Sequence, residues 1–277
     1  MNTKLLIDGD VLVYRMGFAS QSQENGPEPI SHAVHLVKKT VGDMCKKFNT
    51  DNAKVFLTSN DKSNFRFEIA KTLPYKGNRD KKYNPKAAEK PFHYNTLRRY
   101  ILSNYNSVEI YGQEADDAMA IAQMAYIDDP YFETVICTID KDLHQVPGKH
   151  YNFVTEKLFT ATDPGELELV ESEDKKGAKK YKIKGFGCKW FYAQMLLGDS
   201  ADNIPGLKGF GPVKVFNILN KFNTEKDLYD KVKGLYLDRL EDEMTEEDIC
   251  NRVYEVADLL WMRRKEGEMK SDWLKSL

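Results

Sequence analysis

Short apolar runs alternate with amphipathic stretches along the first 160 residues. The runs at 5–7, 55–58, 108–111, 134–139 and 150–155 are mostly apolar or β-branched and predict five strands. Between them, residues 32–48 predict a helix. Ala118, Ile121, Ala122 and Ala125 share one face of another. Strands that alternate with helices form parallel sheets, so the pattern predicts an α/β fold with a mostly parallel central sheet flanked by helices.

The second half of the chain changes character twice. The polar segment 163–184 predicts an insertion with a β-hairpin that turns around Lys175-Lys176-Gly177. From Trp190 the pattern is helical to the end, and Thr245 precedes an acidic first turn, as in a variant capping box. The expected units are an α/β core at 1–160, a polar insertion at 161–188 and a helical region at 189–277.

Composition narrows the class of protein. With 41% hydrophobic and 30% charged residues the chain is typical of a globular protein, and no apolar run approaches the ~20 residues needed to span a bilayer. The four cysteines are scattered without a CxxC pair, which favours reduced thiols. We therefore expect a cytoplasmic monomer that does not bind a membrane.

One segment is strongly basic although the whole chain has a net charge of −2. Residues 71–90 contain seven Lys or Arg against two acids, with Tyr75 and Tyr83 among them. Such a run is either a solvated surface loop or an arm that binds phosphates, because cation–phosphate contacts supply most sequence-independent affinity for nucleic acid. Taken alone, this segment leaves both interpretations open.

Acidic residues follow the predicted strands at the points where the strands end. The carboxyl ends of parallel strands share one edge of a sheet, where ligands bind. Any one of these acids could simply cap a helix or complement its dipole. Gathered together they repel one another unless a cation neutralises them. The acids are Asp8, Asp61, Glu114, Asp116, Asp117, Asp140 and Asp142.

The donor types indicate which cation. An all-oxygen set suits Mg²⁺ or Mn²⁺, whereas zinc would require His or Cys. The nearby His144 has no partner at ligand spacing, so we interpret it as structural. Two such ions ~4 Å apart carry out in-line phosphoryl displacement, the chemistry of nucleases and phosphatases.

A Gly-rich segment at 198–212 separates these two chemistries. Asp199 and Asp202 are three residues apart, so one helical turn could direct both at the same ion. Gly206, Gly209 and Gly211 then predict a tight turn before a helix at 213–222. Glycines let the backbone approach a phosphate closely, and amides at a helix N-terminus bind it.

These motifs together resemble the 5′-nuclease superfamily, which comprises flap endonucleases, the 5′-nuclease domains of bacterial DNA polymerases and phage 5′→3′ exonucleases. The sequence is most similar to the phage exonucleases. The motifs come in the family's order and span residues 5–212. They are Leu6-Ile7-Asp8-Gly9-Asp10, Asp61 with Asn64-Phe65-Arg66, Tyr75-Lys76-Gly77-Asn78-Arg79, Glu114-Ala115-Asp116-Asp117, Thr138-Ile139-Asp140-Lys141-Asp142 and Gly198-Asp199 through Pro212.

The resemblance implies a two-metal 5′→3′ exonuclease with flap endonuclease capability on DNA, acting in replication or primer removal. A phage origin, and hence the host cytoplasm, is also implied. The first metal site would comprise Asp8, Asp61, Glu114 and Asp116, with Asp117. The second would comprise Asp140, Asp142, Asp199 and Asp202.

The resemblance also implies how DNA is held. The Gly-rich unit would be a helix-hairpin-helix motif that grips duplex DNA, with a K⁺ ion. Lys76 and Arg79 would lie at the base of an arch-like segment, 71–100, and contact the scissile phosphate, with help from Arg15. The residues implied in DNA binding are Gly206, Lys208, Gly209, Gly211, Lys214, Lys81 and Lys82.

Two features depart from the family pattern. Some relatives carry Lys where this chain has Gln194, so no cationic role is expected there, and Pro85 and Pro91 argue against a fully helical arch. Three alternatives remain: a PIN-like ribonuclease, a catalytically silent DNA-binding protein and a two-metal phosphatase. The segment 198–212 argues against the ribonuclease, and together with the basic arm against the phosphatase.

Overall fold

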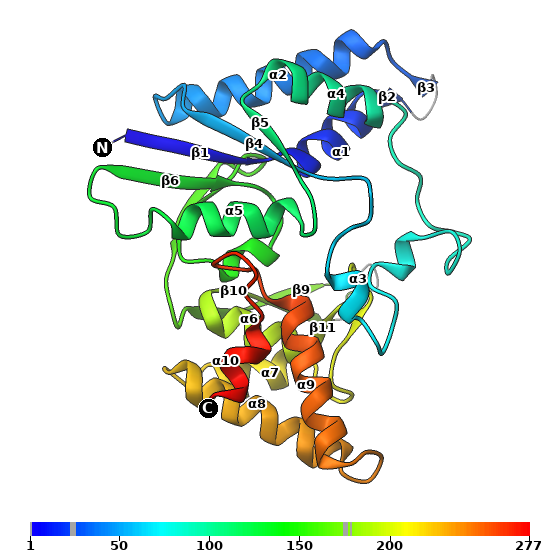
Figure 1. The fold of residues 1–277 in the computed structure, drawn as a ribbon, viewed down its shortest axis with the longest axis vertical. Helices are drawn as coiled ribbons and strands as arrows, with labels where there is room; N and C mark the ends of the chain where they lie inside the picture. The colour runs from blue at the N-terminus through cyan, green and yellow to red at the C-terminus, as the bar shows by residue number, and fades with distance from the viewer. Residues whose placement is uncertain (1, 23–25, 174–176, 178) are drawn as a thin grey trace.

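A six-stranded sheet forms the centre of the N-terminal half (Figure 1). The computed structural model describes residues 2–22, 26–173, 177 and 179–277. The strand order is β5-β4-β1-β6-β7-β8, and β8 alone runs antiparallel to its neighbour. The prediction of a mostly parallel sheet is confirmed. The strands are β1 (Asn2–Asp8), β4 (Ala53–Thr58), β5 (Ser107–Ile110), β6 (Phe132–Cys137), β7 (Gly148–Asn152) and β8 (Lys157–Ala161).

The fifth predicted strand, 150–155, is wrong at its C-terminal end. β7 stops at Asn152, and the chain turns through 153–156 and returns as β8. Glu156 has a φ of 56°, the left-handed conformation that reverses the chain here. Residues 153–155 therefore belong to a turn, although their composition suits a strand.

Helices cover both faces of the sheet. Leu5 and Ile7 of β1 join the cluster under one face, whereas Leu6 joins the cluster under the other. This alternation follows from the pleat, and burial on both faces explains why the strands are nearly all apolar. Helices α1 (Gly9–Ala19), α2 (Ile30–Lys47) and α4 (Tyr94–Asn104) cover the first face, and α5 (Ala115–Met124) covers the second.

Short elements link these layers. A two-stranded pair follows α1, and three single turns of helix lie in the loops around the sheet's carboxyl edge. They are β2 (Gln21–Ser22), β3 (Gly26–Pro27), α3 (Arg66–Ile69), and the 3-10 helices η1 (Gly77–Arg79) and η2 (Asp142–Gln145).

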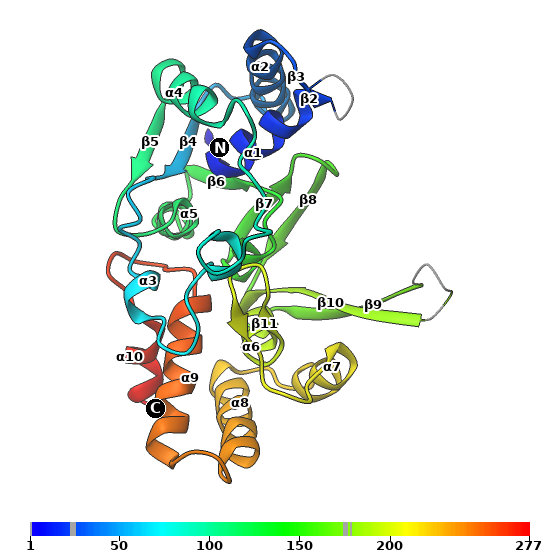
Figure 2. The same cartoon turned by 90° about the vertical axis from the view of Figure 1, so that its right-hand side faces the viewer.

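The polar insertion forms an antiparallel ribbon, β9 (Glu166–Glu173) and β10 (Lys179–Phe186), that projects from the body of the molecule (Figure 2). The strands agree with the predicted hairpin. Lys175 and Lys176, at the predicted turn, lie outside the described residues.

The C-terminal half is helical around α6 (Gly187–Leu197), whose residues are buried from Gly187 to Leu196. A helix that is buried all round must be covered on every side, and α7, α8, α9, η2 and the β9–β10 ribbon provide that cover. Thr245 caps α9 by accepting from the amide of Asp248, as predicted. The remaining elements are β11 (Gly198–Asp199), β12 (Ile204–Pro205), α7 (Pro212–Leu219), α8 (Glu225–Leu240), α9 (Glu246–Leu260) and α10 (Lys270–Lys275).

The strand order creates a crevice at the carboxyl end of β1. The strands that follow β1 in the sequence, β4 and β5, lie on one side of it, and the later strands β6 and β7 lie on the other. The strand order therefore reverses beside β1. In open α/β sheets ligands bind at such a switch point. Among the described residues, no helix has the length and apolar character that crossing a membrane would require.

Candidate active site

A cavity of about 380 Å³ occupies the switch point. It brings together five of the nine predicted metal ligands and also Asp10, which the sequence analysis did not select. A hollow of about 690 Å³ at the opposite edge of the sheet contains Asp51 as its single acid. The convergent charged groups therefore lie at the carboxyl edge, as expected. The five predicted acids in the cavity are Asp8, Asp61, Glu114, Asp116 and Asp140.

Asp8 is fixed by its position between β1 and α1. Its carboxylate caps α1 by accepting from the Val11 amide at 2.9 Å, and it accepts from the Thr138 hydroxyl at 2.6 Å. The next position requires glycine, since a Cβ on Gly9 would lie 2.5 Å from the carbonyl oxygen of Phe56. Burial, reinforced by the charge of Asp10, raises the pKa of Asp8 to about 7.

Asp116 and Asp140 extend the acidic surface. Asp116 lies in the first turn of α5, and burial together with the charges of Asp8 and Asp140 raises its pKa well above the usual range. Asp140 follows β6 and accepts from the Asp142 amide at 2.9 Å. Neither these two nor Asp8 forms an ion pair with any described residue. We call Asp8, Asp116 and Asp140 the unpaired acids.

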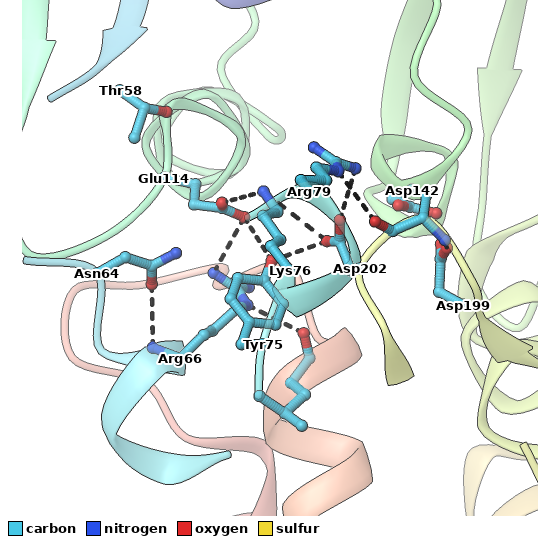
Figure 3. Close-up of polar contacts among 12 residues, drawn as sticks. Thr58, Asn64, Arg66, Tyr75, Lys76, Arg79, Glu114, Asp142, Asp199 and Asp202 are labelled. Atoms are coloured by element: carbon cyan, nitrogen blue, oxygen red, sulfur yellow. Dashed lines mark hydrogen bonds and ion pairs between the residues drawn. The ribbon is translucent and has the colours of Figure 1, made fainter. Parts of the chain in front are cut away.

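Glu114 and Asp202 differ from the unpaired acids in that cations contact them (Figure 3). The Tyr75 hydroxyl lies 2.9 Å from Glu114 and 2.8 Å from Asp202. Lys76 pairs with Glu114, and Arg79 donates to Asp202 at 2.8 Å. Burial alone would raise the pKa of Glu114, but the charges of Lys76 and Arg66 outweigh it and lower that pKa to about 2.

A second cation joins Asp142 to Asp199. The Lys141 Nζ lies 3.0 Å from Asp142 and 2.9 Å from Asp199. Gln194 donates its amide to Asp142 at 2.6 Å, so it contributes a neutral donor there. We call Glu114, Asp202, Asp142 and Asp199 the paired acids.

The hairpin that carries Asp199 and Asp202 differs from the prediction. Asp199 lies on β11 and Asp202 in the turn before β12, so no helical turn aligns them. Asp199 faces Lys141, whereas Asp202 faces Arg79 and Tyr75. The expectation of a helical turn here is wrong, because the two acids lie on a hairpin whose turn is formed by residues 200–203.

Lys76 is held in place by its backbone. Its φ of 53° is left-handed, a conformation that costs a non-glycine residue about 1–2 kcal/mol. Its amide donates to the Asp202 carbonyl at 2.9 Å, and the Arg79 Nε donates to the Ala201 carbonyl at 2.9 Å. The base of the basic segment is thus attached to the hairpin that carries Asp202.

The metal-ligand prediction for Asp117 is wrong. This residue is completely buried, and Arg66 donates to its two oxygens at 2.5 and 2.9 Å. Arg66 also donates to the carbonyls of Leu259 and Trp261 at the end of α9. Adjacent helical residues point about 100° apart, so Asp116 can face the cavity only if Asp117 turns away from it.

Two other predicted residues lie at the margin. Arg15 is on the exposed side of α1 and does not line the cavity, whereas the preceding Tyr14 does. Asp61 lines the cavity but is exposed, and its carboxylate accepts from the Ser63 amide at 2.9 Å.

The acidic cavity adjoins a groove of about 1240 Å³ with which it shares Lys76 and Arg79. Lys81, Lys82 and the exposed ring of Tyr83 line this groove. Lys81 pairs with Glu89 at 2.7 Å. Residues 80–93, all of them described, form turns and extended chain without a helix, in agreement with Pro85 and Pro91.

The Gly-rich turn joins α6 to α7. Gly206 packs against the end of α6, where a Cβ would lie 2.4 Å from the Leu197 carbonyl oxygen. Gly209 has a φ of 89°, whereas Gly211 has a φ of −97° and no neighbour within 4 Å of a built Cβ. The steric requirement for glycine therefore applies to Gly206 and Gly209. Lys214 lies 3.8 Å from the Phe210 ring centroid, and the Lys208 carbonyl accepts from Arg239.

No three Asp, Glu, His or Cys side chains among the described residues are close enough together to hold a metal ion as they stand. Lys76 and Lys141 take up carboxylate oxygens that an ion would otherwise use. Cations of the chain therefore already neutralise part of the acidic surface.

Residues 3–175 match the family model of the 5′-3′ exonuclease, N-terminal resolvase-like domain. This chain belongs to the 5′-3′ exonuclease family, and the prediction of a nuclease is confirmed. The 5′-3′ exonuclease of Buchnera aphidicola is 25% identical over 232 residues, which are 83% of this chain and 74% of that protein. Flap endonuclease Xni of Shewanella frigidimarina is 31% identical over 122 residues, 44% of this chain and 43% of that protein.

Longer relatives also match. DNA polymerase I of Deinococcus radiodurans is 26% identical over 83% of this chain, which spans only 22% of that protein. Among solved structures, a bacteriophage T5 flap endonuclease in a complex with DNA and metal ions has a TM-score of 0.61 at 18% identity, covering 99% of this chain and 97% of the other. This likeness confirms the fold class, including the helical C-terminal region.

Proposed function

We propose that this protein is a divalent-metal-dependent 5′→3′ exonuclease with structure-specific flap endonuclease activity on DNA. One observation carries the proposal: five predicted acids from four separate segments line one cavity at the switch point, and that cavity opens onto a basic groove. A polyanionic substrate can approach so many carboxylates only if cations lie between them.

The donor chemistry fits Mg²⁺ or Mn²⁺. The side chains are carboxylates, the ligands these ions prefer, and lysine ammonium groups already stand beside several of them. Asp8, Asp61, Glu114 and Asp116 would hold one ion, and Asp140, Asp142, Asp199 and Asp202 a second. Asp117 is not proposed. Bound ions would supply Lewis-acid activation of the phosphate and of the attacking water.

Two residues of the chain would act on the phosphate itself. Lys76 and Arg79 line both the cavity and the groove, so they can donate to the scissile phosphate as it enters. To do so, Lys76 must give up its ion pair with Glu114, and Arg79 its ion pair with Asp202, in favour of phosphate oxygens. Donors placed in this way stabilise charge that develops in the transition state. Arg15 could assist only by reaching across from α1.

The duplex would lie on the turn at Gly206–Gly211 and on α7, with Lys208 and Lys214 near the phosphates and K⁺ at the turn. Backbone amides at the N-terminus of α7 suit this contact. The 5′ strand would cross the groove past Lys81 and Lys82. We propose a monomer that acts in replication or primer removal.

Cleavage of a 5′-labelled DNA flap, a duplex with a recessed end and a structured RNA would test this function, each with and without Mg²⁺. We expect Mg²⁺-dependent release of short products from both DNAs and little from RNA. Preferential RNA cleavage would support the PIN-like ribonuclease, and binding without cleavage would support a silent DNA-binding protein. Either result contradicts the proposal.

A further inference from the structure

The side chain of Lys141 occupies the second half of the acidic site. We infer that Lys141 is a built-in cation for Asp142 and Asp199, so that the protein binds one divalent ion tightly and admits a second only when Lys141 withdraws. The inference rests on the proposed function, because it concerns the ions proposed there.

The contacts of Lys141 are those of a shared counter-ion. Its Nζ lies within 3.0 Å of one oxygen on each acid. The side chain of Asp199 is 4% exposed and that of Asp142 18%, whereas the Lys141 side chain is 54% exposed. The ammonium therefore covers two carboxylates that have little other access to water.

The remaining donor at this position is neutral. Gln194 is buried and donates to the same Asp142 oxygen as Lys141 does. Its own carbonyl oxygen is buried and has no hydrogen-bond partner among the described residues. Asp142 thus has one oxygen that accepts two hydrogen bonds, and Lys141 is the partner that brings positive charge.

The backbone of Lys141 is anchored while its side chain reaches solvent. Its carbonyl accepts from the Trp190 Nε1 at 2.9 Å, and η2 begins at the next residue. Trp190 is buried in α6. The side chain can therefore leave the two acids by rotating toward solvent, with no rearrangement of the main chain.

The two halves of the site should then differ in affinity. An ion held by Asp8 and Asp116 displaces no cation of the chain from these two acids, whereas an ion at Asp142 and Asp199 must break two charged hydrogen bonds first. The free energy of one charged hydrogen bond, taken at the weak end of its usual range, corresponds to a difference of about tenfold in dissociation constant.

Mn²⁺ titration of the full-length, metal-free protein, with free Mn²⁺ followed by EPR, would test the inference. We expect two classes of site in the unmodified protein. Lys141→Met should tighten the weaker class about tenfold and leave the stronger class unchanged. Lys141→Gln, which removes the charge but keeps a polar side chain, should act in the same direction.

Lys149→Met is the matched control, since it removes an ion pair with Glu133 on β6, away from the cavity. It should bind Mn²⁺ as the unmodified protein does. If both Lys141 variants keep their melting temperature but leave the weaker class unchanged, the inference is wrong and the proposed function stands. If the unmodified protein binds no Mn²⁺, both are wrong.

Discussion

The unpaired and paired acids lie along the same edge of the sheet but differ in the cations beside them, and Asp8 and Glu114 show the difference most clearly. Burial and neighbouring carboxylates raise the pKa of Asp8 to about 7, whereas Lys76 and Arg66 overcome burial and lower that of Glu114 to about 2. The difference arises from cations supplied by other segments of the chain. The pKa of an acid at this edge therefore depends on its charged neighbours and its burial, and not on its residue type alone.

The two groups of acids therefore have different functions. Among the paired acids, Glu114 and Asp202 hold Lys76 and Arg79 in place before substrate arrives, and Asp142 and Asp199 share Lys141. The unpaired acids retain mutual repulsion that a bound cation, or a retained proton, can relieve. Divalent ions should therefore act first on Asp8, Asp116 and Asp140.

Removing an unpaired acid should have the largest effect. We expect Asp140→Asn to slow cleavage by about 10³-fold or more, equivalent to about 4 kcal/mol of transition-state stabilisation. DNA affinity should stay the same or rise, since a negative charge is lost. Single-turnover cleavage and a binding titration measure the two effects.

Asp128→Asn, an exposed acid before β6, makes the same charge change away from the cavity and should cleave normally. An Asp140→Asn protein with near-normal cleavage would show that the unpaired acids are not the centre of the reaction.

Removing the buried structural acid should affect stability instead. Asp117→Asn leaves Arg66 without its bidentate partner in the interior, a change that typically costs about 3 kcal/mol or more. Urea unfolding of the metal-free protein measures the loss. Asp8→Asn should not lower the free energy of unfolding in this way, because neutralising Asp8 relieves repulsion between carboxylates. An equal loss in the two variants would show that structural and cavity-lining acids do not differ.

Removing a cation of the paired half should slow the reaction less than loss of Asp140. We expect Lys76→Ala to reduce single-turnover cleavage by about 10²-fold, as loss of an oxyanion-hole donor does. Mn²⁺ binding should not weaken, because Glu114 loses a competing cation. A normal cleavage rate would exclude Lys76 from contact with the scissile phosphate.

The smallest expected effect is the pH dependence of stability without metal. Because the folded pKa of Asp8 is about 7 and its ordinary value is 3.8, the folded state retains a proton that the unfolded state has lost. Stability should therefore fall as pH rises from 5 to 7, by on the order of 1 kcal/mol per pH unit. Thermal melts should show this fall in the unmodified protein and a weaker one in Asp8→Asn. A stability that rises between pH 5 and 7 would contradict the predicted direction of the pH dependence.

Local sequence was sufficient to predict the sheet and most of the cavity. Asp8 and Asp140 lie at the ends of buried apolar strands. The carboxyl ends of parallel strands share one edge of the sheet, so the topology alone brings these acids together. The motif Glu114-Ala115-Asp116-Asp117 predicts Asp117 as a ligand, but neighbouring helical residues point about 100° apart, so the sequence does contain the signal that Asp116 and Asp117 face different ways.

Other features depend on distant pairings. Arg66 meets carbonyls 193 and 195 positions away, at the end of α9, and Lys141 meets Asp199 58 positions away. No local pattern encodes these contacts, so the pairing of the acids and the structural role of α9 could not be predicted. Helix α4 and strand β8 were likewise not predicted.

The order in which ions occupy the cavity decides whether the two groups of acids differ as proposed. Crystals of the protein soaked in Mn²⁺ would locate the ions by anomalous scattering. At low Mn²⁺ we expect one site, with oxygen ligands ~2.2 Å away that include at least two of Asp8, Asp116 and Asp140. A second site should appear at Asp142 and Asp199 only at higher Mn²⁺, with Lys141 turned away. A first ion at Asp142 and Asp199, or none in the cavity, would show that the unpaired acids are not the primary metal site.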